Sequence, residues 1–224
     1  MYSTVDAKPK SKTWWTPQTI TWYIRAARNT DFHEKLANRI ALNLNPSQSI
    51  LEVGCGLGYI TKELSCKGYN IEGIDLDKEV IKTGKKLHGL NHKLSVDDYK
   101  TTDKRADVVL AVFCGKVDEE GLGYFERLAN KTIIYIISKH KFNSLKVDKT
   151  DEIIAYLDKT GYQYWLDEFS LRFDQTFLSQ AEADSFFAIQ YGNEGQKLKS
   201  SSGFFPLVYE NQKEMSLFVI NLEK

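Results

Sequence analysis

The chain has 224 residues, of which 42% are hydrophobic and 27% are charged, and its 30 basic and 30 acidic residues balance to a formal charge of zero. This length and composition fit one globular domain with an appended segment. The neutral charge disfavours a dedicated nucleic-acid binder, which is usually basic on one face.

Two further absences bear on where the protein works. No apolar run approaches the ~20 residues that cross a bilayer, and the N-terminal stretch lacks the apolar core of a secretory signal. The three cysteines, Cys55, Cys66 and Cys114, have neither metal-binding spacing nor an even number for disulfides. Reduced thiols are typical of the cytosol, so we expect a cytoplasmic protein without a membrane partner and without a metal.

The first 45 residues predict a tail followed by a helical cap. Residues 1–13 are polar, and from Pro17 to about Asn45 apolar residues recur at helical spacing in two stretches. Asn29, Thr30 and Asp31 interrupt them. We therefore expect residues 1–45 to form a tail and a cap, or lid, over a second unit formed by residues 46–224.

Strand and helix patterns alternate through the middle of the chain. Strands are predicted at 49–54, 69–77, 93–99, 106–115 and 131–138, and helices at 59–68, 78–89, 121–130 and 150–161. This order predicts an α/β fold with a doubly wound, mostly parallel sheet.

The last part of the chain has a different pattern. It predicts a strand at 162–173, a helix at 179–192, a loop at 193–203 and a final strand at 214–222. The alternation in 162–173 is typical of a strand at the edge of a sheet.

A glycine-rich turn, Glu52-x-Gly54-x-Gly56-x-Gly58, follows the first predicted strand. Such a turn lets a ligand approach the main chain and offers amide groups at a helix N-terminus. The dinucleotide fingerprint has a third glycine where this chain has Tyr59. The spacing therefore disfavours a nicotinamide dinucleotide.

The turn resembles motif I of the class I S-adenosylmethionine-dependent methyltransferases. The resemblance is strong over about residues 47–115, only topological over about residues 116–224, and absent at residue level over residues 1–46. It implies a seven-stranded sheet with a reversed strand inserted next to last. It also implies S-adenosylmethionine as the cofactor and S-adenosylhomocysteine as the product.

The same resemblance implies roles for single residues. An acid at the end of the second strand, here Asp75, accepts hydrogen bonds from both ribose hydroxyls, and an acid after the third strand, here Asp97 or its neighbour Asp98, accepts one from adenine. Glu52 orients the turn or the methionyl ammonium, and Ala111 lies near the methionine moiety. The cofactor-binding residues expected from the resemblance are Glu52, Gly54, Cys55, Gly56, Gly58, Asp75, Leu76, Asp97, Asp98 and Ala111.

The methyl acceptor is less well specified. Enzymes of this class that methylate base amino groups carry an Asn/Asp-Pro-Pro-Tyr/Phe motif after the fourth strand, whereas this chain has AVFCGK. Cys114 is interpreted as a small buried residue rather than a nucleophile. His140 follows the fifth strand and is the candidate general base, with an ordinary pKa of ~6.5. The alternative for His140 is a solvated loop histidine.

Aromatic residues near the N-terminus suggest an acceptor pocket. The candidates are Trp14, Trp15, Tyr23 and His33, since aromatic faces attract cations and exclude water. The alternative is that these rings only fix the first helix to the core. Tyr191, Phe204 and Phe205 are candidates for the opposite wall, and Arg25, Arg28 and Arg172 for contacts with an acidic acceptor.

We therefore expect an S-adenosylmethionine-dependent methyltransferase that methylates oxygen or nitrogen of a small molecule. One alternative is an RNA or protein methyltransferase that uses the lysine-rich stretch after the fifth strand. Another is a non-catalytic, methyltransferase-like protein that only binds the cofactor. The sequence leaves the oligomeric state open.

Overall fold

A computed structural model describes residues 15–116, 118–142, 145–147, 149–191 and 197–222. Its centre is a seven-stranded sheet in the order β3-β2-β1-β4-β5-β12-β8. The strands of this sheet are β1 (Ser49–Val53), β2 (Asn70–Asp75), β3 (Leu94–Val96), β4 (Ala106–Val112), β5 (Ala129–Ser138), β8 (Gln163–Arg172) and β12 (Gln212–Asn221). The helices are α1 (Pro17–Asn29), α2 (Phe32–Ala41), α3 (Tyr59–Cys66), α4 (Lys78–His88), α5 (Glu119–Leu128), α6 (Thr150–Thr160) and α7 (Gln180–Tyr191).

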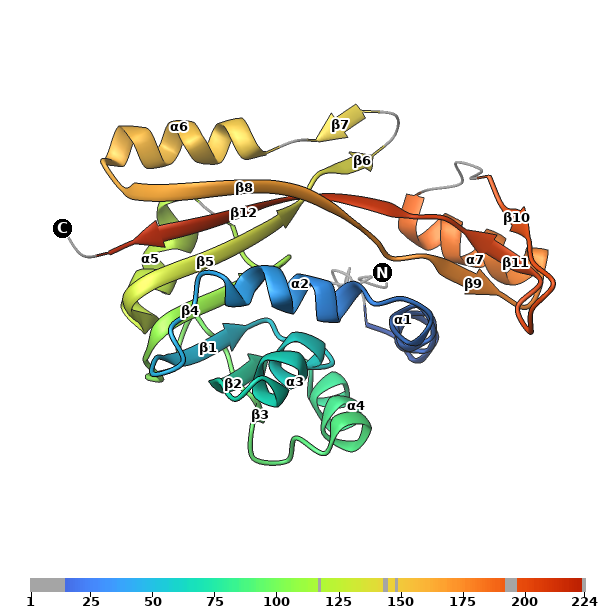
Figure 1. Ribbon diagram of the computed structural model, residues 1–224, viewed down its shortest axis with the longest axis horizontal. Helices are drawn as coiled ribbons and strands as arrows, with labels where there is room; N and C mark the ends of the chain where they lie inside the picture. The colour runs from blue at the N-terminus through green and yellow to red at the C-terminus, as the bar shows by residue number, and fades with distance from the viewer. Residues whose placement is uncertain (1–14, 117, 143–144, 148, 192–196, 223–224) are drawn as a thin grey trace, which may run out of the picture.

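The strand directions confirm the predicted fold class. β1 to β5 pair in parallel, and β12 pairs antiparallel with both β5 and β8. The reversed strand thus lies next to last, with β8 at the edge of the sheet. β8 and β12 stay paired from Gln163↔Asn221 to Arg172↔Gln212, and Figure 1 shows them running past the parallel strands toward α7.

Side chains of the central strands pack alternately into two hydrophobic clusters, one on each face of the sheet. On one face Val109 and Ile133 pack with Phe125 of α5 and Leu157 of α6. On the other face Val108, Leu110 and Ile134 pack with residues of α1, α2 and α3. Because a strand presents successive side chains to opposite faces, apolar runs such as VVLAV cover both sides. α1 and α2 therefore contribute to the same cluster as the sheet.

A C-terminal lobe lies beyond the parallel strands, beside α1 (Figure 1). It contains α7 and a small antiparallel sheet of β9 (Gln175–Phe177), β10 (Lys199–Ser200) and β11 (Leu207–Tyr209). Trp22 of α1 packs into its core with Phe177, Phe186 and Phe187. The lobe is thus fastened to the N-terminal helices.

The predicted helices and long strands are present in the structure with ends that differ by a few residues, and the shortest strands were not predicted. β10 falls inside the predicted loop 193–203, and β12 begins two residues before the predicted strand. The strands β9 and β11 and the hairpin of β6 (His140–Phe142) and β7 (Leu145–Val147) were also not predicted. Strands of two or three residues carry too little periodicity to predict. No helix in the described ranges is long and apolar enough to cross a membrane.

Candidate active site

The glycine turn between β1 and α3 has a conformation that glycine adopts more readily than other residues. Gly54 has φ +64° and Gly56 has φ +54°, in the left-handed region that a Cβ disfavours. A Cβ on Gly54 would lie 2.1 Å from the Cys114 Sγ, and one on Gly56 would lie 3.0 Å from the Trp15 ring. Neighbouring groups therefore already occupy the space that a side chain at Gly54 or Gly56 would need, which explains why the turn has glycine at these positions.

A cavity of about 580 Å³ lies over this turn. Its walls come from the turn, from the ends of β1, β2 and β4, and from α1, α2 and α3. The lining includes Trp15, Tyr23, His33, Glu52, Gly54, Cys55, Gly56, Tyr59, Asp75, Phe113, Cys114 and Lys213. The carboxyl ends of the parallel strands meet here, where ligands bind in open α/β sheets.

Asp75 fixes the turn from the end of β2. One carboxylate oxygen accepts a hydrogen bond from the Gly56 N–H at 2.9 Å, and the other accepts one from the Asp77 N–H at 2.9 Å. A carboxylate offers about four acceptor positions. Asp75 can therefore hold the turn and still accept hydrogen bonds from a ligand in the cavity.

Glu52 is a buried acid on the floor of the same cavity. It is 3% exposed, and Thr61 Oγ1 donates a hydrogen bond to its Oε2 at 2.5 Å. Burial raises the pKa of Glu52 from 4.5 to about 7. No cationic side chain among the described residues forms an ion pair with this carboxylate, and a buried carboxylate of this kind favours a ligand that brings a positive charge.

Tyr23 and His33 meet at the wall formed by the N-terminal helices. The Tyr23 hydroxyl lies 2.8 Å from His33 Nε2, and the His33 ring stacks on Tyr59 with centroids 4.4 Å apart. Burial lowers the pKa of His33 to about 3, so the imidazole is neutral. The structure thus brings Trp15, Tyr23 and His33 to one cavity.

A second cavity of about 380 Å³ adjoins the first. Tyr23, Gln190 and Lys213 line both cavities. Six of the thirteen described residues that line the second one are aromatic, namely Trp22, Tyr23, Phe173, Phe186, Tyr191 and Tyr209. Its volume suits a small molecule.

Several residues predicted to bind cofactor do not line the first cavity. Asp97 accepts hydrogen bonds from Thr102 Oγ1 at 2.7 Å and from the Asp98 N–H at 2.9 Å, in the turn after β3. Leu76 is 64% exposed, and Ala111 is buried in the cluster beside α5. Their assigned roles stay predictions, as does that of Gly58, which precedes α3 with φ +76°.

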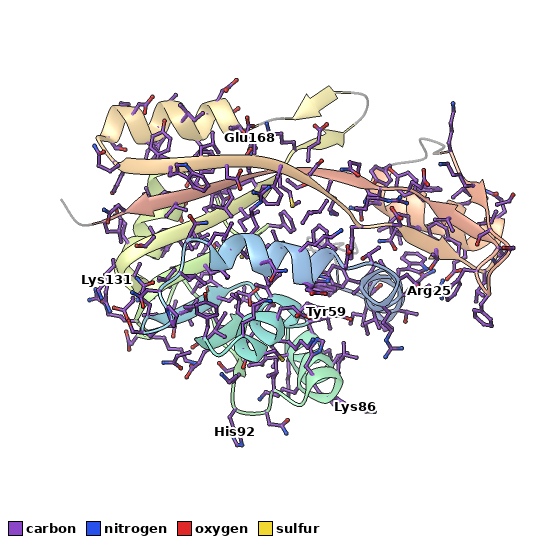
Figure 2. All side chains as sticks on the ribbon, in the orientation of Figure 1. Arg25, Tyr59, Lys86, His92, Lys131 and Glu168 are labelled. Carbon is purple, nitrogen blue, oxygen red and sulfur yellow. The ribbon has the colours of Figure 1, made fainter. Side chains whose placement is uncertain are left out.

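The other predicted acceptor-site residues have varied positions. Trp14 lies outside the described residues, and so does the side chain of His140, whose main chain begins β6. Arg25 pairs with Glu182 at 2.9 Å, and Arg172 pairs with Asp174. In Figure 2 Arg25 lies on α1 next to the C-terminal lobe. Tyr191 lines the second cavity, whereas Phe204 is 83% exposed.

Neither a thiolate nor a metal cluster is evident at the site. Burial raises the pKa of Cys114 to about 12, so this thiol stays protonated. In the described ranges no three His, Cys, Asp or Glu side chains are grouped to hold a metal ion. His92 points away from Tyr59 at the edge of the molecule (Figure 2).

Phe113 and Lys213 are site residues that the sequence analysis missed. Phe113 directly follows β4, and Lys213 is the second residue of β12. The sequence did contain one signal for Lys213. It is a charged residue two positions before Met215, and the alternation of side chains in a strand places it on the same face as this buried residue.

Comparison with known proteins identifies the central segment. Residues 50–130 match the family model described as a methyltransferase domain. An uncharacterized methyltransferase of Schizosaccharomyces pombe is 39% identical over 66 residues, which are 29% of this chain and 25% of that protein. A ubiquinone biosynthesis O-methyltransferase of Hahella chejuensis is 35% identical over 57 residues, 25% of this chain and 24% of that protein. The matches span about a quarter of the length of these two relatives.

The whole fold is similar to solved structures. A TehB-like SAM-dependent methyltransferase from Corynebacterium glutamicum aligns with a TM-score of 0.52 and 18% identity, over 90% of this chain and 94% of that one. The structural similarity confirms the predicted fold. The match of residues 50–130 to a methyltransferase domain agrees with the predicted superfamily.

Proposed function

We propose that this chain, whose residues 50–130 carry a methyltransferase domain, is an S-adenosylmethionine-dependent methyltransferase that acts on a small-molecule acceptor. The observation that carries the proposal is the pair of joined cavities that share Tyr23, Gln190 and Lys213. Methyl transfer needs a donor and an acceptor held close together in line. The cavity over the glycine turn suits the donor, and the second cavity suits the acceptor.

The donor is assigned to the cavity over the glycine turn. Asp75 has acceptor positions left for ribose hydroxyls, and Glu52 offers a negative charge to the methionyl ammonium. Gly54, Cys55 and Gly56 line this cavity, so the methionine moiety would bind beside the main chain of the turn. S-adenosylmethionine supplies the activated methyl group when it is bound.

The acceptor is assigned to the second cavity, and methylation on oxygen or nitrogen is proposed. The aromatic lining and the modest volume suit a small, flat molecule better than an RNA or protein segment. One matched relative is by name an O-methyltransferase of ubiquinone biosynthesis.

The residues of the chain contribute mainly by positioning. The acceptor oxygen or nitrogen forms a bond to the methyl carbon while the sulfonium bond breaks, and the acceptor loses a proton. The donor is already activated, so alignment and exclusion of water carry most of the rate. Tyr23 and Phe173 border the second cavity, and Tyr23 also borders the first.

The test begins with calorimetric titration of S-adenosylmethionine and S-adenosylhomocysteine. A folded wild type that binds them with micromolar affinity supports the donor site, and one that binds neither contradicts the proposal. Methyl-labelled cofactor is then added with a metabolite extract, an RNA pool or a protein pool. Label in the small-molecule fraction is expected, whereas label only in RNA or protein would favour the alternative acceptors. Bound cofactor without any labelled product would favour a non-catalytic role.

A further inference from the structure

Lys213 projects from β12 at the end of a row of core side chains. Lys213, Met215 and Leu217 share one face of the strand because side chains alternate. Met215 and Leu217 are fully buried among residues of the N-terminal helices and the central strands. Lys213 continues this row into the space where the two cavities meet. A lysine at the end of a row of buried apolar side chains departs from the hydrophobic pattern of the strand, and such departures often occur at functional sites.

Two aromatic rings accompany the Lys213 ammonium. Its Nζ lies 5.5 Å from the Phe113 centroid and 5.6 Å from the Phe173 centroid, within the range of a cation–π interaction. It forms no ion pair in the part of the chain that the structure describes. Burial alone lowers the pKa of Lys213 to about 8. The site therefore holds a cation whose charge no carboxylate of the described chain balances.

The backbone under one of these rings is strained. Phe113 is the one described non-glycine residue with a positive φ, +54°, a strained conformation that concentrates at functional sites. Its N–H donates a hydrogen bond to the Ile136 carbonyl at 2.9 Å, which fixes the residue directly after β4. The surrounding structure thus holds Phe113 in this unusual conformation, with its ring beside the Lys213 ammonium.

The neighbouring cations are already paired. Lys139, the other described lysine that lines the second cavity, forms an ion pair with Glu168. Arg25 and Arg172 pair with Glu182 and Asp174. Lys213 is therefore the lining cation whose charge is available to a ligand.

We propose that the methyl acceptor is a small acid with a flat, unsaturated body, and that its carboxylate binds the Lys213 ammonium. The inference rests on the proposed function and adds the substrate class. The rings of the second cavity, Trp22, Phe173, Tyr191 and Tyr209 among them, suit a flat body. A carboxylate near Lys213 would also offset the repulsion between this ammonium and the donor sulfonium.

The competing role for Lys213 is to bind the methionine carboxylate of the cofactor, since Lys213 also lines the first cavity. The two roles differ in what a neutral side chain at this position would weaken. A cofactor role predicts weaker binding of S-adenosylhomocysteine. An acceptor role predicts loss of preference for acids in the presence of bound S-adenosylhomocysteine.

The test uses the full chain as wild type, Lys213→Met and the matched control Lys100→Met. Lys100 Nζ also lies over a ring, 5.3 Å from the Tyr124 centroid, but outside both cavities. Each protein is first titrated with S-adenosylhomocysteine. The S-adenosylhomocysteine complexes are then titrated with benzoate, 4-hydroxybenzoate and cinnamate, and with the primary amide of each acid.

We expect the wild-type complex and Lys100→Met to bind at least one acid about tenfold or more tightly than its amide, as a charge-assisted hydrogen bond implies. Lys213→Met should lose this preference while its affinity for S-adenosylhomocysteine stays within about threefold.

If no acid is preferred in the wild type, or if Lys213→Met keeps the preference, the inference is wrong. If Lys213→Met weakens S-adenosylhomocysteine but not methylthioadenosine, which lacks the amino-acid part, Lys213 serves the cofactor instead. A wild type that binds no S-adenosylhomocysteine contradicts the proposed function itself.

Discussion

The cavity over the glycine turn takes most of its lining from successive β–α units, whereas the adjoining cavity takes its lining from α1, α7 and the ends of β8 and β12. In the first region most of the residues are close in sequence or lie at the ends of adjacent parallel strands, and the rest come mainly from the N-terminal helices. In the second region they come together only after the C-terminal lobe has packed against α1. The first region is thus specified by local turn chemistry, and the second by long-range packing.

This difference explains what could be predicted from the sequence. The spacing of Glu52, Gly54 and Gly56 and the position of Asp75 follow from the strand–turn–helix pattern, and the structure gathers all four at one cavity. The doubly wound, mostly parallel sheet was predictable from the same alternating pattern, whereas the reversed strand next to last was implied by the resemblance to the methyltransferases. Lys213 and Phe113 were not, because no periodicity indicates that a residue near the start of β12 meets one after β4. The positions of α7 and β9–β11 likewise depend on tertiary contacts.

The largest effect is expected from Gly54→Ala in the first region. The added Cβ would meet the Cys114 Sγ at 2.1 Å, at a residue with φ +64°. We expect affinity for S-adenosylhomocysteine to fall more than about 100-fold and the free energy of unfolding to fall by about 2–4 kcal/mol. Calorimetry and urea denaturation measure the two quantities.

Gly123→Ala is the matched control for this change. Gly123 lies in α5, and a Cβ there meets nothing within 4 Å. It should stabilise the protein by about 0.5–1 kcal/mol, because alanine favours helix over glycine. Normal affinity of Gly54→Ala for S-adenosylhomocysteine would show that cofactor binding does not require glycine at this position of the turn.

The next largest effect is expected from Asp75→Ala, which removes a carboxylate that holds the turn and faces the cavity. Affinity for S-adenosylhomocysteine should fall by about 1.5–3 kcal/mol, as for hydrogen bonds to a charged group. The control Asp77→Ala removes only the N-cap of α4, so it should cost about 1 kcal/mol of stability and leave the affinity unchanged. Equal losses in the two variants would contradict a direct contact between Asp75 and the cofactor.

A third change separates the second region from the first. Glu182 of α7 accepts hydrogen bonds from Trp22 Nε1 at 3.0 Å, Arg25 Nη1 at 2.9 Å and the Leu178 N–H at 2.7 Å. Glu182→Ala should lower the free energy of unfolding by about 1–3 kcal/mol, because these donors lose their partner. We expect normal S-adenosylhomocysteine affinity and impaired methyl transfer. Weakened cofactor binding would show that the two regions are not separable.

The smallest expected effect is a pH dependence in the first region. Glu52 has a pKa raised to about 7 by burial, with Asp75 and Tyr23 as titratable neighbours. A ligand ammonium favours the ionised carboxylate. Affinity for S-adenosylhomocysteine should therefore rise roughly five- to tenfold between about pH 6 and about pH 7.5.

The stability of the unliganded protein should change in the opposite direction. The native state holds the Glu52 proton up to about pH 7, while the unfolded chain releases it near 4.5. The contribution of Glu52 is thus complete below about pH 4.5 and is lost as the pH rises through about 7. Glu52→Gln should remove both pH dependences. A slope that persists in Glu52→Gln would assign the titration to another group.

The interior place of β12 also has a consequence for how the protein is made. β12 is the last strand of the described chain, yet it lies between β5 and β8 and pairs with both. Until the ribosome has released residues 212–221, the apolar edge of β5, with Ile133, Ile134 and Ile136, has no antiparallel partner. Unpaired apolar strand edges invite association with other chains. The nascent protein therefore completes its central sheet only after β12 has left the ribosome, and chaperone protection of β5 is most needed until then.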